Sequence, residues 1–334
     1  MFILGIESSC DDTSVALVKV SGRGKNFVVL SGKTASQIEV HKKYGGVVPE
    51  IAGRQHAEKI LPLIEAVLER QPKPDVIAVT AGPGLITGLL VGVEAAKALS
   101  YLWNIPLVRV NHISGHAHSV ELENKIVFPA LCLIVSGGHT ELLLMKNHTD
   151  FELIGKTRDD AAGETFDKVG KLLGFDYPGG AKISQAAEGG DVNAIKFPRP
   201  MINEGYEFSF AGLKTAALYW LRDNDEALEL RHFSASFEQA IIDVLVTKTL
   251  RAAKAYKPKS IILAGGVSAN KKLREQLKNK LKTNALELLA PNLKYAMDNA
   301  AMIAVAGYYK AIKKDFTPWQ KIEADPNWTV YPMK

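Results

Sequence analysis

Two histidines, His112 and His116, stand four residues apart in this chain of 334 residues, and their spacing is the clearest sign of chemistry in the sequence. On a helix, residues i and i+4 lie on one face, so the two imidazoles could bind the same metal ion. His118 follows two residues later and would point away from that face. The spacing alone is not specific, and a pair of packed or surface histidines is the alternative.

A carboxylate that could complete a metal site is Asp298, which stands between Met297 and Asn299. An Ala-rich, nearly uncharged helix is predicted over residues 298–312 and is expected to be buried. Asp298 would then be the N-cap of this helix, a role worth about 1 kcal/mol. Service as a metal ligand is the alternative for this side chain.

Polar turns follow two apolar runs and could meet an anionic ligand. The run at residues 2–7 leads into the Ser- and Asp-rich residues 8–13, and the run at 130–135 leads into Ser136-Gly137-Gly138-His139-Thr140. Each passage is typical of a hairpin, with a strand, a polar turn and a second strand. Such turns expose backbone N–H groups and hydroxyls, which suit an anion.

Two further passages join a strand to a glycine-rich turn and then to a helix. This arrangement places unpaired N–H groups and the positive end of a helix at one point. The first unit is predicted at residues 75–80, 81–84 and 89–102, and the second at residues 260–263, 264–270 and 271–281. Other helices are predicted at residues 48–68 and 161–173.

The hairpins and the strand–turn–helix units occur in the same order, which predicts a duplicated α/β chain. This layout resembles the actin-like (ASKHA, ribonuclease-H-like) two-lobe fold of sugar kinases and heat-shock chaperones, with the ligand cleft between the lobes. Lobe I would comprise residues 1–115 and 298–325, and lobe II residues 116–297. The pattern by itself therefore indicates ATP binding.

Composition sets limits on the class of protein. Hydrophobic residues make up 47% and charged residues 23%, the balance of a soluble globular protein. We see no apolar stretch of about 18 residues and no secretion signal, and we expect no membrane partner. The two cysteines, Cys10 and Cys132, are in unrelated contexts and predict a reducing cytoplasm.

The net charge of +5 permits a polyanionic partner without requiring one. The densest basic run lies at residues 271–282. It could form a nucleic-acid surface, although a solvated helix face is the more usual role of such a run.

A series of motifs extends the pattern over almost the whole chain, in a specific order and spacing. They lie at residues 5–11, 44–50, 81–84, 111–116, 135–140, 162–168, 177–180, 208–215, 265–270 and 298–304. In these motifs the chain resembles the TsaD (Gcp, Kae) family of tRNA N6-adenosine threonylcarbamoyltransferases, in its bacterial form. The resemblance runs from residue 3 to residue 327.

The resemblance implies transfer of a threonylcarbamoyl group from threonylcarbamoyl-AMP to N6 of adenosine 37, in tRNAs that read ANN codons, to form t6A. It implies that His112, His116 and Asp298 hold one metal ion per subunit, iron first and zinc as the alternative, which orients the acyl donor. An older assignment as a glycoprotease is disfavoured, because a zinc protease of the HExxH kind needs a glutamate where Ile113 stands.

The same resemblance implies roles for the polar turns. Asp11 would accept the proton lost by the attacking amine. Asp167 and Gly180 would contact the ribose, although Asp167 could instead be a solvent-facing helix residue, and Asn270 would contact the adenine or phosphate end. The residues expected to meet the rest of the substrate are Ile134, Val135, Ser136, Gly137 and Gly138.

Two positions depart from the family pattern. Ser184 stands where many relatives have Asp, and Met297 stands where Thr is usual. The first change puts a ribose contact in doubt, and the second removes a hydroxyl that could orient Asp298. We expect activity to survive both.

The expected partners are tRNA, a TsaB-like paralogue and a TsaE-like ATPase, with a TsaC-type synthase supplying the substrate. The helix at residues 48–68 is a candidate surface for the paralogue. The residues considered for contact with tRNA or a partner, each equally a surface residue, are Arg54, His56, Lys214 and Lys271.

Two other functions compete with the transferase. A sugar or carboxylate kinase of the same superfamily would need ATP and magnesium and would not need the histidines. An ATP-switched chaperone or scaffold would need a separate substrate-binding domain. Neither explains His112, His116 and Asp298 as a set.

Overall fold

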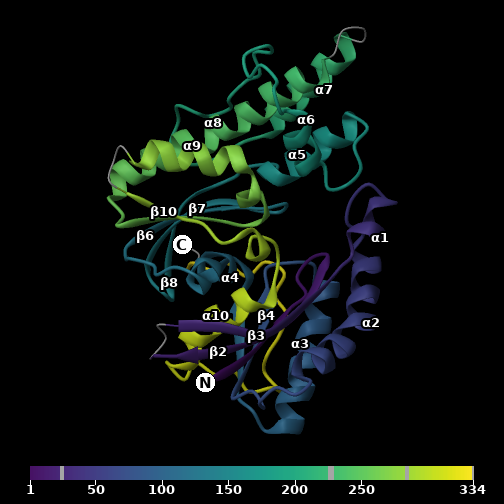
Figure 1. Cartoon of the computed structure of the whole chain (residues 1–334), viewed down its shortest axis with the longest axis vertical. Coiled ribbons are helices and arrows are strands. Elements are labelled where there is room, and N and C mark those ends of the chain that lie inside the picture. The colour runs from purple at the N-terminus through teal and green to yellow at the C-terminus, as the bar shows by residue number, and fades with distance from the viewer. Residues whose placement is uncertain (23–25, 225–228, 283–285, 333–334) are drawn as a thin grey trace. The chain divides into compact units, whose positions relative to one another are not determined.

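The computed structural model describes the whole chain except residues 23–25, 225–228, 283–285 and 333–334. The chain forms two compact units (Figure 1). Unit 1 comprises residues 1–126, 146–151 and 291–334, and unit 2 comprises residues 127–145 and 152–290. The division into lobe I (residues 1–115 and 298–325) and lobe II (residues 116–297) stays a prediction.

Unit 1 contains a five-stranded sheet in the order β3-β2-β1-β4-β5. Strand β1 pairs antiparallel with β2 and parallel with β4, and Gly5 lies opposite both Ala16 and Ala78. The strands are β1 (Phe2–Glu7), β2 (Asp12–Ser21), β3 (Asn26–Ser36), β4 (Val76–Gly82) and β5 (Leu107–Asn111). The hairpin and the strand predicted at residues 75–80 are therefore confirmed.

Helices cover both faces of this sheet, because successive side chains of a strand point to opposite faces. Ile3 packs in a cluster with α10, and its neighbour Leu4 packs in another with α2 and α3. Figure 1 shows α10 beside the strands from the start of the chain. The helices of unit 1 are α1 (Ile38–Lys42), α2 (Pro49–Leu68), α3 (Ile86–Trp103), α4 (His112–His118) and α10 (Ala300–Ala311), with short 3-10 turns at Ser119–Leu122 (η1) and Leu293–Tyr295 (η3).

Helix α10 is buried along almost its whole length, as its composition predicts. It lies so close to β1 that a Cβ at Gly5 would come 2.1 Å from the carbonyl oxygen of Ala300. Gly5 is therefore required by packing. Among the described helices, α3 alone has the length and apolar composition of a membrane span, and here it packs against α2 and β4.

Unit 2 repeats the topology of unit 1 with a sheet in the order β10-β9-β6-β7-β8. Strand β6 pairs antiparallel with β7 and parallel with β9, as β1 does with β2 and β4. The strands are β6 (Ala130–Val135), β7 (Thr140–Asn147), β8 (Asp150–Lys156), β9 (Ser260–Ala264) and β10 (Glu287–Leu289). The predicted duplicated, actin-like α/β fold is confirmed.

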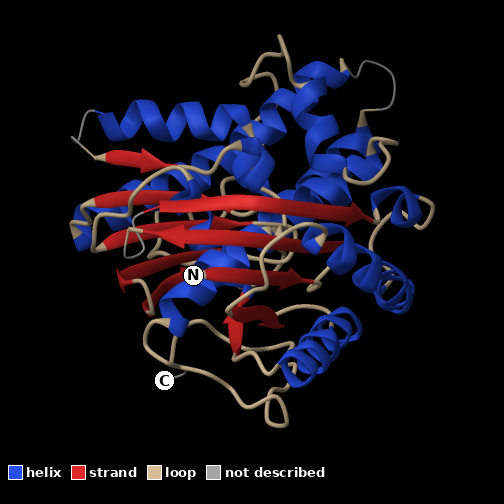
Figure 2. Ribbon diagram, turned by 60° about the horizontal axis from the view of Figure 1, so that its bottom comes forward, coloured by secondary structure: helices blue, strands red, loops and turns tan. Residues whose placement is uncertain are grey.

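The core of unit 2 is built around α8 (Leu230–Tyr256), whose Phe233 and Phe237 pack edge-on against Phe197. Figure 2 shows the helices in blue and the strands that they cover in red. The other helices are α5 (Ala162–Leu172), α6 (Gly179–Ala186), α7 (Ala211–Asp223) and α9 (Lys271–Lys282), with a 3-10 turn at Gly266–Ala269 (η2).

The basic helix α9 is amphipathic. Leu273, Leu277 and Leu281 recur every four residues and are buried, whereas Lys278 and Lys280 are exposed. Most of the basic side chains therefore occupy the solvated face of a helix that packs on the core of unit 2, whereas Arg274 is partly buried and donates to the carbonyl of Ser268.

Candidate functional site

The end of β5 and the start of α4 bring two histidines together. Asn111 caps α4, because its Oδ1 accepts hydrogen bonds from the backbone N–H groups of Ile113 (3.0 Å) and Ser114 (3.4 Å). The rings of His112 and His116 lie on one side of this helix with their centroids 4.6 Å apart. The predicted helical placement of the pair is confirmed.

Asp298 lies against both rings. Its Oδ1 is 3.1 Å from Nε2 of His116 and 3.6 Å from Nε2 of His112. The ligand atoms of the three residues all lie within 4.8 Å of one another. His116 is fully buried, and the Asp298 side chain is 20% exposed, so the cluster is reached from the carboxylate side.

The prediction that Asp298 caps the last helix is wrong. Helix α10 begins at Ala300, and its N-cap is Asn299, whose Oδ1 accepts from the N–H of Met302 at 3.0 Å. The Nδ2 of Asn299 also donates to the carbonyl of Met297 at 2.8 Å. Because Asn299 takes the capping role, the carboxylate of Asp298 faces the histidines.

Glu7, at the end of β1, holds His112 from the opposite side. Its fully buried carboxylate is 3.0 Å from Nδ1 of His112 and accepts from the Thr80 hydroxyl (2.7 Å) and the Ser9 N–H (2.6 Å). Burial would lower the pKa of His112, but Asp298 and Glu7 outweigh it and raise the pKa to about 9. The same charges favour a cation at this point, whether a proton or a metal ion.

A metal ion fits the donor set of this cluster. Neither ring nitrogen of the buried His116 has a hydrogen-bond partner among the described residues, although its Nε2 lies 3.1 Å from Asp298. Buried polar atoms rarely lack a hydrogen-bond partner. A shared metal ion accounts for this arrangement, because two ligands of one ion lie close together without being aligned for a hydrogen bond to each other. Two imidazoles and one carboxylate suit zinc or iron and leave coordination positions open.

Asp11, the predicted proton acceptor, lies in the β1–β2 turn of the same unit, and its carbonyl accepts from the N–H of Gln37 at 3.0 Å. Its neighbour Asp12, which the sequence analysis did not consider, is largely buried. Burial, supported by the charges of Asp11 and Asp298, raises the pKa of Asp12 to about 7 despite a hydrogen bond with Ser36. The carboxyl of Asp12 is therefore suited to proton exchange near neutral pH.

In unit 2, Ile134 and Val135 end β6, and the next residues form a tight turn. Ser136 N–H donates to the carbonyl of His139 at 2.8 Å. A Cβ built at Gly137 or Gly138 would meet no described atom within 4 Å, and neither glycine has a positive φ. Neither packing nor backbone conformation of the described chain requires glycine here, so the turn leaves room for a ligand to approach the backbone.

Asp167 and Gly180 are brought together at the start of α6. Oδ1 of Asp167 accepts from the N–H of Gly179 at 2.8 Å and from that of Gly180 at 3.3 Å. Asp167 thus joins α5 to α6, rather than only facing solvent.

Asn270 and Ser184 belong to one hydrogen-bond network with Glu238. Nδ2 of Asn270 donates to Oε1 of Glu238 at 2.7 Å and to the Ser184 hydroxyl at 2.9 Å. Ser184 in turn donates to Glu238 at 2.7 Å. The departure from Asp at position 184 is therefore accommodated, and Glu238 is a participant that the sequence analysis missed. Met297, the other departure, is 48% exposed.

The residues considered for tRNA or partner contact differ in their surroundings. His56 is fully buried, with Nδ1 2.7 Å from the Thr13 hydroxyl and Nε2 2.9 Å from the Cys10 carbonyl, so its assignment to the surface is wrong. Arg54 is exposed and pairs with Glu50 at 2.7 Å. Lys214 forms an ion pair with Asp160, and Lys271 is exposed.

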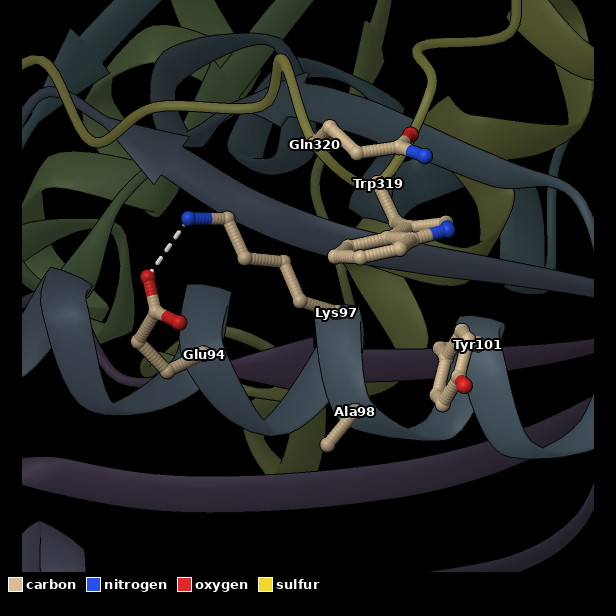
Figure 3. Close-up of a pocket in the computed structure, with 6 residues that line it drawn as sticks. All are labelled: Glu94, Lys97, Ala98, Tyr101, Trp319 and Gln320. Atoms are coloured by element: carbon tan, nitrogen blue, oxygen red, sulfur yellow. Dashed lines mark hydrogen bonds and ion pairs between the residues drawn. The ribbon is translucent and has the colours of Figure 1, made fainter.

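A surface pocket of about 400 Å³ lies elsewhere in unit 1, between α3 and the segment near Trp319 (Figure 3). The rings of Tyr101 and Trp319 lie there with centroids 5.2 Å apart and their planes tilted by 58°, and Lys97 pairs with Glu94 at 2.6 Å. The lining residues are Glu94, Lys97, Ala98, Tyr101, Trp319 and Gln320. None of them belongs to the predicted site.

Comparison with known proteins identifies the family whose sequences this chain matches and solved structures that share its fold. The family model TsaD, described as tRNA N6-adenosine threonylcarbamoyltransferase, matches residues 28–305. Proteins of that name from Bacillus subtilis (strain 168) and Geobacillus thermodenitrificans (strain NG80-2) are 51% and 48% identical, over 92% and 94% of this chain and 90% and 94% of theirs. The solved activator of the 2-hydroxyisocaproyl-CoA dehydratase from Clostridium difficile, with bound ADPNP, covers 94% of this chain and 97% of its own, with a TM-score of 0.55 and 13% identity, and shows the fold alone.

Proposed function

The chain belongs to the TsaD family of tRNA N6-adenosine threonylcarbamoyltransferases, and from this membership we propose how its own residues carry the reaction. The protein is a transferase that acts on tRNA and forms t6A. The donor is threonylcarbamoyl-AMP, and the acceptor is adenosine 37 of tRNAs that read ANN codons. A bond forms between the carbamoyl carbon and N6, the bond from that carbon to the phosphate oxygen breaks, AMP leaves, and N6 loses a proton.

His112, His116 and Asp298 are the proposed ligands of one metal ion per subunit, iron first and zinc as the alternative. The observation that carries this assignment is the cluster itself, in which a buried histidine without a hydrogen-bond partner among the described residues lies 3.1 Å from a carboxylate oxygen. When bound, the ion would supply Lewis-acid polarisation of the acyl donor. Glu7 orients the ring of His112 through Nδ1 and leaves Nε2 directed toward Asp298.

The remaining roles fall to the polar turns. The strand end and turn formed by Ile134, Val135, Ser136, Gly137 and Gly138 contact the donor, which the open space at the two glycines supports. Asp167 and Gly180 contact the ribose, and Asn270 contacts the adenine or phosphate end. Asp11 accepts the proton that N6 loses, and the raised pKa of Asp12 makes it the alternative acceptor.

The partners follow from the same membership. A TsaB-like paralogue and a TsaE-like ATPase assist the transfer, and a TsaC-type synthase supplies the donor. Helix α2 is the proposed surface for the paralogue, and its Leu61 is 58% exposed. The cytoplasm is the proposed location, in keeping with the free thiols of Cys10 and Cys132.

The test is t6A formation on an unmodified tRNA with the purified chain, the synthase, threonine, bicarbonate, ATP and the two partners. Wild type should form t6A, and His112→Ala should lose both bound metal and activity. Because His112→Ala leaves Glu7 buried without its partner, the near-isosteric Asp298→Asn is measured beside it, with circular dichroism to check folding. Full activity in a metal-free, folded variant would overturn the metal assignment, and ATP-dependent phosphorylation of a small acceptor instead would favour the kinase.

A further inference from the structure

A second group of metal-ligand side chains lies in unit 1 and has no part in the proposed reaction. His118 ends α4, Glu121 lies in η1, and His148 lies in the turn between β7 and β8. Oε2 of Glu121 is 3.8 Å from Nε2 of His118 and 3.4 Å from Nδ1 of His148. Like the first cluster, these three ligand atoms lie within 4.8 Å of one another.

The separations match what a metal ion would impose. Ligand atoms bound to zinc at 2.0–2.1 Å with tetrahedral angles stand about 3.4 Å apart. The distances of 3.4 and 3.8 Å from Glu121 to the two rings are close to that value. Binding would therefore need only small side-chain movements.

Hydrogen bonding prepares His118 as a ligand through Nε2. Its Nδ1 lies 2.7 Å from the backbone carbonyl of Ser114, which can only accept, so Nδ1 carries the proton and Nε2 carries the lone pair. Nε2 is fully buried and is not aligned for a hydrogen bond with a described side chain, and a backbone hydrogen bond with His148 also holds the ring. A buried lone pair in this position is what a metal ligand requires.

Tyr309, on α10, holds the other two residues. Its hydroxyl donates to Oε1 of Glu121 at 2.7 Å, while Oε2 of the same carboxylate is buried and has no hydrogen bond within the described chain. The Tyr309 ring also stacks on the ring of His148, with centroids 3.6 Å apart and planes 7° from parallel. Both contacts fix the orientation of Glu121 and His148, as groups that hydrogen-bond to or pack against metal ligands do in known metal sites.

We propose that His118, Glu121 and His148 form a second metal site, which takes zinc or another divalent cation of similar ligand preference. The donor set of two imidazoles and one carboxylate is that of the His112, His116 and Asp298 cluster, but the second site uses a different face of α4. His118 is fully buried and the His148 side chain is 30% exposed, so a water molecule on the His148 side completes the coordination.

The test counts zinc ions in the full chain after removal of metal and dialysis against micromolar zinc, with metal analysis of the protein. Wild type should hold two zinc ions, His116→Ala one, His148→Ala one, and the double variant none. His232→Ala, a histidine of unit 2 paired with Glu229, is the matched control and should hold two. Cobalt in place of zinc gives a visible absorption spectrum for each site in the variant that keeps only that site.

The result that overturns the second site is a His148→Ala protein that binds as much zinc as wild type. If His148→Ala does not fold, Glu121→Gln replaces it, because the amide keeps the hydrogen bond from Tyr309 and loses the charge, and it should weaken zinc binding at this site at least ten-fold. A folded Glu121→Gln with unchanged affinity would also overturn the proposal. Loss of zinc from the first cluster alone concerns the proposed function and leaves this site standing.

Discussion

His112 is held between two carboxylates, and this arrangement decides what its ring can do. Glu7 lies 3.0 Å from Nδ1 and Asp298 lies 3.6 Å from Nε2. A buried carboxylate behind a metal-binding imidazole raises the basicity of the ring and fixes its orientation. Glu7 should therefore tune metal affinity without contacting the ion.

Replacing Glu7 by Gln tests that role. The amide keeps the size of the side chain and an oxygen that can accept from Nδ1, but it removes the charge. We expect metal affinity at the first cluster to fall about 10- to 100-fold, as for other groups that orient metal ligands. Competition with a chelator of known affinity measures the change, and Glu58→Gln on the exposed side of α2 is the control. Equal affinities of the two variants would show that Glu7 only packs.

Glu141, in β7 of unit 2, gives a prediction about pH. Burial raises the pKa of this carboxyl from its ordinary value of 4.5 to about 7, despite the opposing effect of Lys156. Between these two values the folded chain holds more protons than the unfolded chain. The contribution of this carboxyl to the free energy of unfolding is therefore fully present below pH 4.5 and is lost as the pH rises through 7.

Glu141→Gln should remove that dependence. Relative to wild type, the variant should gain roughly 3 kcal/mol between pH 4.5 and pH 8, since each pKa unit corresponds to about 1.4 kcal/mol. Urea unfolding of unit 2 followed by hydrogen exchange at several pH values measures the difference. Glu188→Gln, an exposed substitution, should change stability by less than about 0.5 kcal/mol. A difference between Glu141→Gln and wild type that does not vary with pH would contradict the prediction.

At the scale of elements, the β6–β7 turn and the start of α5 contain one glycine that packing requires and another that packing does not require. A Cβ at Gly163 on α5 would come 2.5 Å from the carbonyl oxygen of Ser136, whereas a Cβ at Gly137 would meet no described atom within 4 Å. The start of α5 thus packs against the β6–β7 turn at Ser136, and the turn is open at Gly137. The two glycines are expected to have different roles for this reason.

Alanine at these positions should give opposite results. Gly163→Ala should destabilise unit 2 by about 1–3 kcal/mol, because a backbone oxygen cannot move aside easily. Gly137→Ala should leave stability unchanged and raise the KM for the threonylcarbamoyl donor, because the methyl group enters the space proposed for it. Thermal unfolding and steady-state kinetics of both variants measure this. Normal kinetics in Gly137→Ala would show that the donor lies elsewhere.

On the scale of the whole molecule, each unit carries its own sheet, its own core and one share of the proposed chemistry. Both sets of metal-ligand residues lie in unit 1, and the proposed donor contacts, residues 134–138, 167, 180 and 270, lie in unit 2. Metal binding should therefore stabilise unit 1 first.

Hydrogen exchange with and without metal tests this division. At a metal concentration about 100 times the Kd, binding contributes about 2.7 kcal/mol, so amides of α4 and α10 that exchange by opening of unit 1 should slow about 100-fold. Amides of α8 and β9 in unit 2 should change little. Equal slowing in both units would show that they open together, contrary to this expectation.

Local patterns in the sequence were enough to predict most of the central strands, several helix starts and the pair of histidines on α4. Apolar runs predicted β1, β4, β6 and β9, and the polar turns predicted the hairpin partners β2 and β7. Glycine-rich turns predicted the starts of α3 and α9, and the HxxxH spacing placed two histidines on one helix face. The long helix α8 was missed because it is buried along most of its length, so no alternation of polar and apolar residues reveals it. Strand β3 was missed too, and its mixed exposure gives no regular alternation.

Tertiary structure alone decided which side chains meet. Asn299 rather than Asp298 caps α10, because each can accept the same backbone hydrogen bond and only the packing of the helix selects between them. Glu7 reaches His112 across 105 residues of chain, and His148 reaches Glu121 through a turn that packs within unit 1. Contacts between residues far apart in sequence cannot be predicted from local patterns, because only the packing of the sheets and helices brings these residues together.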